Sequence, residues 1–172
     1  MRVADKIAEW MYDKGIKHIF TIVGAGNVCL LDALANQGKI EVVPFHHEQA
    51  AVMASAYYYR TCGKIAPSIV TIGAGSSNAI TGVLAASMDS IPVLVISGNE
   101  PTKFFAKPGP RVVGIQGYDS AGFVREITKY ACQATTGLDV IRAVEMAYRT
   151  TLEPRQGPVW VDLPQDIARM EA

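Results

Sequence analysis

The unit that decides the fold of this chain is plainest in residues 68–88, SIVTIGAGSSNAITGVLAASM. Residues 68–72 are rich in β-branched side chains and predict a strand, whereas residues 77–88 carry a helical pattern. Gly73 and Gly75 form a tight turn between the two. Strand, turn and helix in this order build the α/β proteins whose sheet is parallel.

The same unit recurs from one end of the chain to the other. Strands are predicted at 18–23, 40–43, 68–72, 92–96 and 158–162, with a weaker one at 129–133, and helices at 3–14, 28–36, 48–61, 77–88 and 138–152. Several of the strands are nearly continuous apolar runs, which is typical of parallel strands covered on both faces. We therefore expect an α/β fold in which residues 1–172 form a single three-layer domain, with about six mostly parallel strands and helices on both faces.

Length and charge narrow the class of protein further. The chain has 172 residues, 49% of them hydrophobic, and 16 basic residues balance 16 acidic ones. A net charge of zero offers no support for a nucleic acid or an anionic membrane as partner. No apolar run approaches the ~20 residues of a membrane span, and the N-terminal residues lack the apolar core of a signal peptide. We expect a cytoplasmic protein that binds neither nucleic acid nor membrane.

The cysteines and histidines do not form a metal motif. Cys29, Cys62 and Cys132 are widely spaced and include no CxxC pair. This pattern fits reduced thiols in the core better than disulfides or a zinc site. His18, His46 and His47 do not add ligands at a metal-site spacing. We expect no metal ligands in this chain.

Two glycine turns are candidate parts of a ligand site. Residues 24–26, Gly-Ala-Gly, join a predicted strand to a helix, but Cys29 stands where a dinucleotide fingerprint requires its third glycine. The turn at 73–78 lacks the lysine of a phosphate-binding loop. Taken singly, each is most simply a tight turn. Together, they place small residues at the carboxyl ends of parallel strands, where open α/β sheets bind ligands.

Glu48 is the candidate reactive group. It follows the histidines at 46–47 and begins the helix 48–61. The simplest explanation is that an acid in the first turn complements the helix dipole. However, this helix is apolar nearly all round, which predicts burial on more than one side and makes an ionised carboxylate costly unless it is paired or protonated. A carboxyl group in such surroundings is a candidate for proton transfer.

Three further features near these residues carry expectations. The tyrosines at 57–59 are predicted to pack within the helix, and the histidines at 46–47 to make local hydrogen bonds. The stretch from Asn99 to Asp119 contains three prolines and three glycines between two regular elements. A loop of that length in a compact domain usually serves a site or a partner.

Taken together, these segments resemble the N-terminal, pyrimidine-binding domain of thiamine-diphosphate-dependent enzymes, specifically the acetolactate-synthase-like group. The resemblance extends over essentially the whole chain. The matching residues are, in order, 19–20, 24–25, 47–50, 63–64, 71–75, 78, 82, 89–92, 96–98, 116, 127–129 and 157–159.

The resemblance implies a role for each site residue. Glu48 matches the glutamate that hydrogen-bonds the cofactor's aminopyrimidine ring and favours its imino tautomer. In the family this tautomer deprotonates the thiazolium carbon, and the resulting carbanion attacks a 2-keto acid. Gln116 matches a glutamine that reaches the reaction centre. The residues implied to line the cofactor cleft beside Glu48 are Gly24, Ala25, Thr71, Gly73, Ala74 and Asn78.

The resemblance also implies that this chain holds half of an active site. The family binds diphosphate and Mg²⁺ through a GDG motif followed by an asparagine, and this sequence contains no GDG. The oxygen ligands of the metal must then come from a diphosphate-binding domain or subunit, in a homo- or hetero-oligomer. The isolated chain, whether a natural small subunit or a fragment of a longer enzyme, is expected to be inactive. FAD is a further cofactor that the resemblance allows in the complete enzyme.

Departures from the family pattern bear on the reaction. Ala74 stands where the family usually has proline, Ala25 replaces the second glycine of the first turn, and residues 99–115 form a longer stretch than in typical acetolactate synthases. Residues 114–117 lack the His-His pair of simple 2-keto-acid decarboxylases. Carboligation or acyl transfer on a 2-keto acid or related carbonyl is therefore favoured. A decarboxylase component, a non-catalytic module of the same fold and a nucleotide-binding domain are the alternatives.

Overall fold

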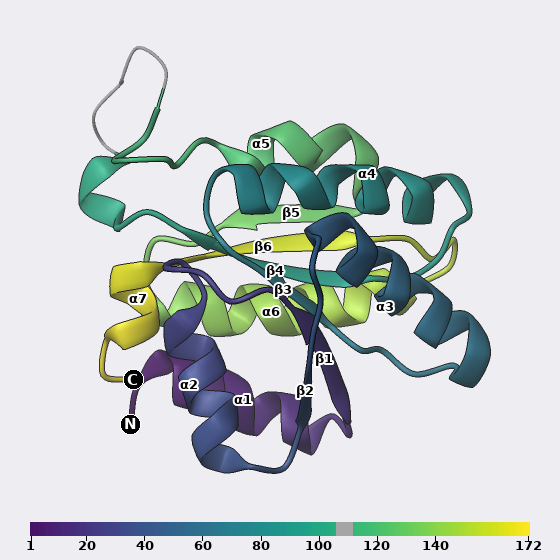
Figure 1. The fold of residues 1–172 in the computed structure, drawn as a ribbon, viewed down its shortest axis with the longest axis horizontal. Coiled ribbons are helices and arrows are strands. Elements are labelled where there is room, and N and C mark those ends of the chain that lie inside the picture. The colour runs from purple at the N-terminus through teal and green to yellow at the C-terminus, as the bar shows by residue number, and fades with distance from the viewer. Residues whose placement is uncertain (106–111) are drawn as a thin grey trace.

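A parallel six-stranded sheet forms the centre of the molecule. The computed structural model describes residues 1–105 and 112–172, and its strands are ordered β2-β1-β3-β4-β6-β5 (Figure 1). The strands are β1 His18–Thr21, β2 Glu41–Pro44, β3 Ser68–Val70, β4 Leu94–Asn99, β5 Tyr130–Gln133 and β6 Val159–Pro164. Every neighbouring pair is parallel. The predicted α/β fold with about six parallel strands is confirmed.

Helices connect the strands. The described residues form α1 Val3–Asp13, α2 Val28–Gln37, α3 Glu48–Cys62, α4 Ala74–Met88, α5 Ser120–Val124, α6 Gly137–Leu152 and α7 Gln165–Arg169, with short 3-10 helices η1 Thr102–Phe104 and η2 Arg125–Ile127. All five predicted helices are present. The sequence did not predict α5 and α7, because five residues are too few to display a helical period.

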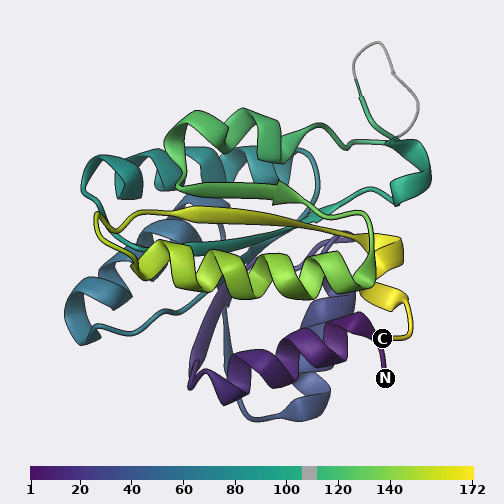
Figure 2. The same cartoon turned by 180° about the vertical axis from the view of Figure 1, so that it is seen from behind.

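The helices cover both faces of the sheet, which confirms the predicted three layers. In Figure 1, α4 and α5 lie above the sheet and α6 below it, and Figure 2 shows α1 and α6 together on the second face. Along a strand, successive side chains enter different cores: Ile69 packs with α1, α2 and α6, whereas Val70 packs with α3, α4 and α5. Strands buried on both faces therefore read as continuous apolar runs.

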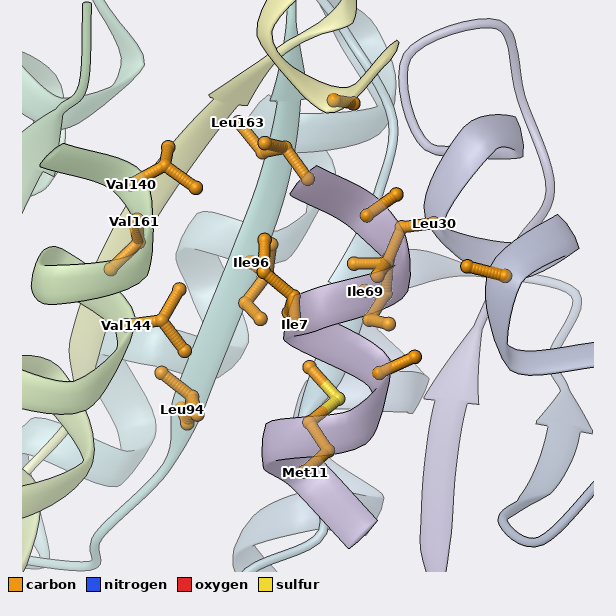
Figure 3. Close-up of a cluster of buried hydrophobic side chains, with 14 of the residues drawn as sticks. Ile7, Met11, Leu30, Ile69, Leu94, Ile96, Val140, Val144, Val161 and Leu163 are labelled. Carbon is orange, nitrogen blue, oxygen red and sulfur yellow. The ribbon is translucent and has the colours of Figure 1, made fainter. Parts of the chain in front are cut away.

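The larger core lies between the sheet and the helices α1, α2 and α6. Figure 3 shows Ile7 and Met11 of α1, Leu30 of α2, and Val140 and Val144 of α6 around the strand residues Ile69, Leu94, Ile96, Val161 and Leu163. All ten side chains are almost completely buried. Burial of this apolar surface is the main source of stability for the domain.

The connections diverge between β1 and β3. The chain leaves β1 through α2, which packs on one face, and leaves β3 through α4, which packs on the other. Since β1 and β3 are neighbours in the sheet, their carboxyl ends form a topological switch point. Open α/β sheets bind their ligands in the crevice at such a point. The two glycine turns predicted from the sequence therefore meet at this edge.

One element begins earlier than its pattern suggested. Residues 74–76, predicted to belong to a turn, already lie in α4. Gly73 adopts φ 63° and ψ −122°, which reverses the chain in one residue. The Ser77 N–H donates to the Gly73 carbonyl oxygen at 2.9 Å, so helical bonding starts immediately. Ala74 and Asn78 are therefore residues of the first helical turns, not of a loop.

Helix α3 is buried on two sides and exposed on a third. It contacts the sheet at β1 and β3 and packs along α4, as its apolar sequence predicted. Ala50 and Tyr57 face solvent, with Tyr57 62% exposed, and Cys62 is exposed at the helix end. The predictions that Tyr57 packs and that Cys62 is a core thiol are therefore wrong, because both residues lie on the side away from the sheet and α4.

Part of the predicted long loop can be described. Residues 99–105 and 112–119 are placed, whereas Pro108, Gly109 and Pro110 of the predicted loop lie outside the described residues. Within the described ranges, none of the helices combines the length and the hydropathy needed to cross a bilayer.

Close backbone approach at Gly98 predicts a sharp response to substitution. A β-carbon added at Gly98 would lie 2.5 Å from the carbonyl oxygen of Gly26, and backbone atoms cannot move aside easily. Gly98→Ala should lower the free energy of unfolding by about 3 kcal/mol. Gly157→Ala is the control, because its β-carbon would meet only the flexible Lys129 stem, at 3.3 Å. Its cost should be about 1 kcal/mol. Urea unfolding of both variants measures the difference, and equal losses would contradict this packing argument.

Candidate functional site

Thr71 joins the two glycine turns at the carboxyl edge of the sheet. Its hydroxyl accepts a hydrogen bond from the Gly26 N–H at 3.0 Å. A β-carbon at Gly24 would lie 2.6 Å from the Thr71 Cβ, and one at Gly75 would lie 2.5 Å from its Cγ2. Only residues without a β-carbon permit this contact. The segments after β1 and β3 thus form one surface, with Thr71 between them.

Glu48 lies at the start of α3 and is buried against α4. Its side chain is 7% exposed, and its Oε2 accepts a hydrogen bond from the Asn78 Nδ2 at 3.1 Å. The other oxygen, Oε1, would lie only 3.0 Å from a β-carbon at Gly75. The glycine therefore allows the first turn of α4 to pack closely against Thr71 and the carboxylate.

The local sequence explains why Glu48 occupies this place. The His47 Nδ1 accepts a hydrogen bond from the Gln49 N–H at 3.2 Å, so this histidine caps α3. The predicted local hydrogen-bonding role of His47 is confirmed. The cap fixes the first turn of α3, and Ala51 and Val52 behind Glu48 are fully buried. The carboxylate is consequently held at the switch point by a capped helix that packs on an apolar core.

Gln116 reaches the same edge from a distant part of the sequence. Val113 and Gly117 form an isolated antiparallel bridge, with hydrogen bonds of 2.8 and 2.9 Å. A β-carbon at Gly73 would lie 2.5 Å from the Gln116 carbonyl oxygen. The backbone of Gln116 therefore rests on the turn that starts α4, while its side chain is exposed.

The structure brings most of the predicted site residues into one chain of contacts. Gly24 touches Thr71, Thr71 touches Gly75 beside Glu48, Glu48 bonds to Asn78, and Gly73 touches Gln116. Ala25 and Ala74 are exposed next to Gly24 and Gly73, and their side chains do not take part in these contacts. In the part of the chain that the structure describes, no three His, Cys, Asp or Glu side chains are grouped to hold a metal ion.

Asp162 is a buried acid that the sequence analysis did not single out. It is fully buried in β6 and accepts hydrogen bonds from Ser120 Oγ at 2.7 Å, Trp160 Nε1 at 2.8 Å and Asn99 Nδ2 at 3.0 Å. Burial raises the pKa of this carboxyl from 3.8 to about 6, although the hydrogen bonds oppose the rise. The sequence did contain a signal for Asp162, because an acid within an otherwise apolar parallel strand must be protonated or hydrogen-bonded.

Glu100 is the second buried acid that the sequence analysis missed. It follows β4, is 5% exposed, and its Oε1 accepts hydrogen bonds from the N–H groups of Ile115 and Gln116, each at 3.1 Å. No local pattern could reveal this role, because its partners lie 15 and 16 residues further along the chain.

A parallel sheet with a buried acid at its switch point defines a ligand-binding α/β domain. Comparison with protein families makes the class specific. The sequence profile described as "Thiamine pyrophosphate enzyme, N-terminal TPP binding domain" matches residues 1–122, and the chain belongs to this family. Thiamine pyrophosphate is another name for thiamine diphosphate, so the resemblance found in the sequence is confirmed.

The sequence similarity to curated relatives extends over nearly the whole chain. The acetolactate synthase isozyme 3 large subunit of Escherichia coli is 34% identical over 164 residues, which are 95% of this chain and 28% of that protein. The acetolactate synthase large subunit of Buchnera aphidicola is 34% identical over 168 residues, 98% of this chain and 28% of that protein. The chloroplastic acetolactate synthase of Arabidopsis thaliana is 31% identical over 172 residues, and the alignment covers 98% of this chain and 24% of that protein. The chain thus spans about a quarter of the length of these relatives.

The raised pKa of Asp162 predicts a pH-dependent stability. The folded state favours the protonated carboxyl, so the contribution of this group is full below pH 4 and is lost as pH rises through about 6. Asp162→Asn removes the titration. The unfolding free energy of the unaltered protein minus that of the variant should therefore fall by roughly 2 kcal/mol between pH 4 and 7. Denaturant titrations across this range measure it, with Asp89→Asn at a surface carboxyl as control for the lost charge. A difference that is constant over pH would contradict the assignment.

Proposed function

We propose that residues 1–172 act as one pyrimidine-binding domain of a thiamine-diphosphate-dependent enzyme, in which Glu48 activates the cofactor. The observation that carries this proposal is the buried Glu48 carboxyl group at the switch point, which is bonded through Oε2 to Asn78 and has no hydrogen-bond partner for Oε1 among the described residues. Membership of the thiamine pyrophosphate enzyme family supports the choice of cofactor.

The residues present fit an aminopyrimidine ring. Among the described residues, the Glu48 Oε2 accepts a hydrogen bond from the Asn78 amide, whereas Oε1 has no hydrogen-bond partner and lies beside Gly75. A carboxyl oxygen in this position can bond to a ring nitrogen. The absence of side chains at Gly24 and Gly75 lets the two turns pack directly on Thr71, so that backbone groups lie beside the carboxylate. We assign the pyrimidine contacts to Gly24, Ala25, Glu48, Thr71, Gly73, Ala74 and Asn78.

The chain's own groups have separate tasks in this mechanism. When bound, thiamine diphosphate supplies an acidic thiazolium C–H and an electron sink for reactions at a carbonyl carbon. Glu48 would hold a proton at its Oε1 for a pyrimidine ring nitrogen, and Asn78 orients the carboxyl group by donating a hydrogen bond to Oε2. The buried Ala51 and Val52 keep water from the inner side of the carboxylate. Gln116 provides a polar side chain for the oxygen atoms of the substrate.

The rest of the active site belongs to a partner in this proposal. The sequence contains no GDG motif, so the ligands of Mg²⁺ and of the diphosphate come from a diphosphate-binding domain or subunit, in a homo- or hetero-oligomer. FAD is a proposed additional cofactor of that complete enzyme.

The relatives guide the choice of reaction. Their names support an acetolactate-synthase-like carboligation or acyl transfer on a 2-keto acid, with decarboxylation as the alternative. A non-catalytic module is disfavoured, because it would have no use for a buried carboxylate beside a glycine-lined edge. The nucleotide-binding domain is disfavoured as well, because the chain belongs to the thiamine pyrophosphate enzyme family.

Replacement of Glu48 tests the proposed activation. In the enzyme completed with its diphosphate-binding partner, Glu48→Gln retains an oxygen acceptor for Asn78 but loses the transferable proton. Hydrogen–deuterium exchange at the thiazolium carbon of bound cofactor should slow at least ~100-fold. Glu41→Gln is the matched control, since that carboxyl is 70% exposed beside His18 and should change the rate little. Equal exchange rates in Glu48→Gln and the unaltered enzyme would remove Glu48 from the mechanism.

Binding by the isolated chain tests the half-site. Calorimetry with thiamine diphosphate and Mg²⁺ should show little heat, because only the pyrimidine contacts are available. Addition of the diphosphate-binding partner should restore binding. The same titration of Glu48→Gln controls for heat that arises elsewhere on the chain. Tight, Mg²⁺-dependent binding by this chain alone would overturn the division of the site.

A further inference from the structure

We propose that Glu100 is a positioning residue, whose buried carboxylate fixes the hairpin of residues 113–117 and thereby places Gln116 at the cofactor edge. The claim that Glu100 positions the hairpin rests on the hydrogen bonds and packing of the hairpin. The claim that this positioning matters for the reaction rests on the proposed function of Gln116. Four features of the structure support the positioning role.

The first feature is the bonding of the carboxylate. The Glu100 Oε1 accepts two successive backbone N–H groups, from Ile115 and Gln116, each at 3.1 Å. Successive N–H groups that converge on one point form an anion-binding concavity, and hydrogen bonds to an ionised acceptor are stronger than neutral ones. The hairpin therefore offers its backbone to a negative charge, and Glu100 supplies that charge from within the protein.

The second feature is the close fit of the hairpin around the side chain. Gly114 has φ 66°, and a β-carbon there would lie 2.7 Å from the Glu100 Cδ. A β-carbon at Gly117 would lie 2.6 Å from the Glu100 Cγ. Both glycines are needed for the backbone to wrap around the carboxyl group. Glu100 is accordingly 5% exposed although the hairpin lies at the surface.

The third feature is the anchoring of Glu100 in the core. Its N–H donates to the Asn99 Oδ1 at 2.8 Å, and the Asn99 Nδ2 donates to the buried Asp162 at 3.0 Å. Asn99 and Asp162 belong to the adjacent strands β4 and β6. The carboxylate is thus attached to the centre of the sheet, and the position of the hairpin follows that of β4.

The fourth feature is what the hairpin exposes. The Ile115 and Gln116 N–H groups point inward to Glu100, but the Ile115 side chain is 87% exposed and that of Gln116 is exposed too. On its other side the Gln116 backbone rests on Gly73 at the start of α4. Burying a carboxylate is costly. The two backbone hydrogen bonds offset this cost, and they fix the backbone of the hairpin. The side chains of the hairpin remain available at the edge where Glu48 lies.

Amide exchange in the full chain tests the positioning without any need for activity. In Glu100→Ala, the amides of Ile115 and Gln116 should exchange at least about tenfold faster, because two charge-assisted hydrogen bonds are lost. The amides of β4 and β6 should keep their protection. Glu100→Gln retains an acceptor oxygen and should restore most of the protection. Glu126→Ala is the control, because this exposed acid lies beside Ser87 and Gly157 and away from the hairpin, and it should leave both amides unchanged.

Gly114→Ala gives an independent measurement, which decides the question even where Glu100→Ala fails to fold. The added methyl group would displace the hairpin from an intact Glu100, so the same two amides should lose protection. If Glu100→Ala folds and these amides exchange at an unchanged rate, the proposal is overturned. If Glu100→Ala does not fold, unchanged exchange of the same amides in Gly114→Ala overturns it.

A double-mutant cycle connects the positioning to the reaction. In the completed enzyme, with pyruvate as the test 2-keto acid, Glu100→Ala should reduce turnover in the presence of Gln116 and have little further effect in a Gln116→Ala background. Fully additive losses would overturn the claim that Glu100 acts through Gln116. If Gln116→Ala leaves turnover unchanged, the proposed function of Gln116 fails, whereas the exchange measurement still decides whether Glu100 holds the hairpin.

Discussion

The candidate site depends on the contact of backbones at the carboxyl ends of β1, β3 and β4. Thr71 lies against Gly24 and Gly75, its hydroxyl accepts the Gly26 N–H, and Gly98 lies against Gly26. Segments separated by more than 40 residues approach as closely as their main chains allow. Because Gly24, Gly26, Gly75 and Gly98 carry no side chains, their backbones can pack this closely on one another and on Thr71. The Glu48 carboxylate is then the main charged group that this part of the edge offers to a ligand.

Three acids are buried at or near this edge, and each is held differently. Glu48 has one amide donor, from Asn78, and lies against Gly75. Glu100 is bonded through one oxygen to the backbone of a hairpin, and Asp162 accepts bonds from three side chains in the core through both oxygens. A buried carboxylate whose two oxygens both have donors within the protein is structural, and Asp162 is of this kind. Glu48 and Glu100 each keep one oxygen without a hydrogen-bond partner among the described residues, and Glu48 differs from Glu100 in its place beside the turn that follows β3.

The proposed function divides the active site into two halves. The chain spans about a quarter of its acetolactate synthase relatives and belongs to the family of their N-terminal cofactor-binding domain. A pyrimidine half and a diphosphate half make different demands. The first requires a carboxylate in an apolar, glycine-lined edge, and the second requires oxygen ligands for a divalent ion. The described residues supply the first set.

The sequence by itself determined the features that rest on short-range patterns. Alternating strand and helix periods predicted all six strands and the five longer helices, and the glycine turns with Glu48 indicated the edge of the sheet that carries the site. The tertiary structure alone decided the rest. The start of α4 depends on the backbone angles of Gly73, and the burial of Glu100 depends on amides 15 and 16 residues away. The surroundings of Asp162 depend on side chains from β4 and α5. Periodicity records which face of an element is apolar, and it can show that an acid such as Asp162 in an apolar strand needs partners. The local sequence does not show which distant residues supply those hydrogen bonds.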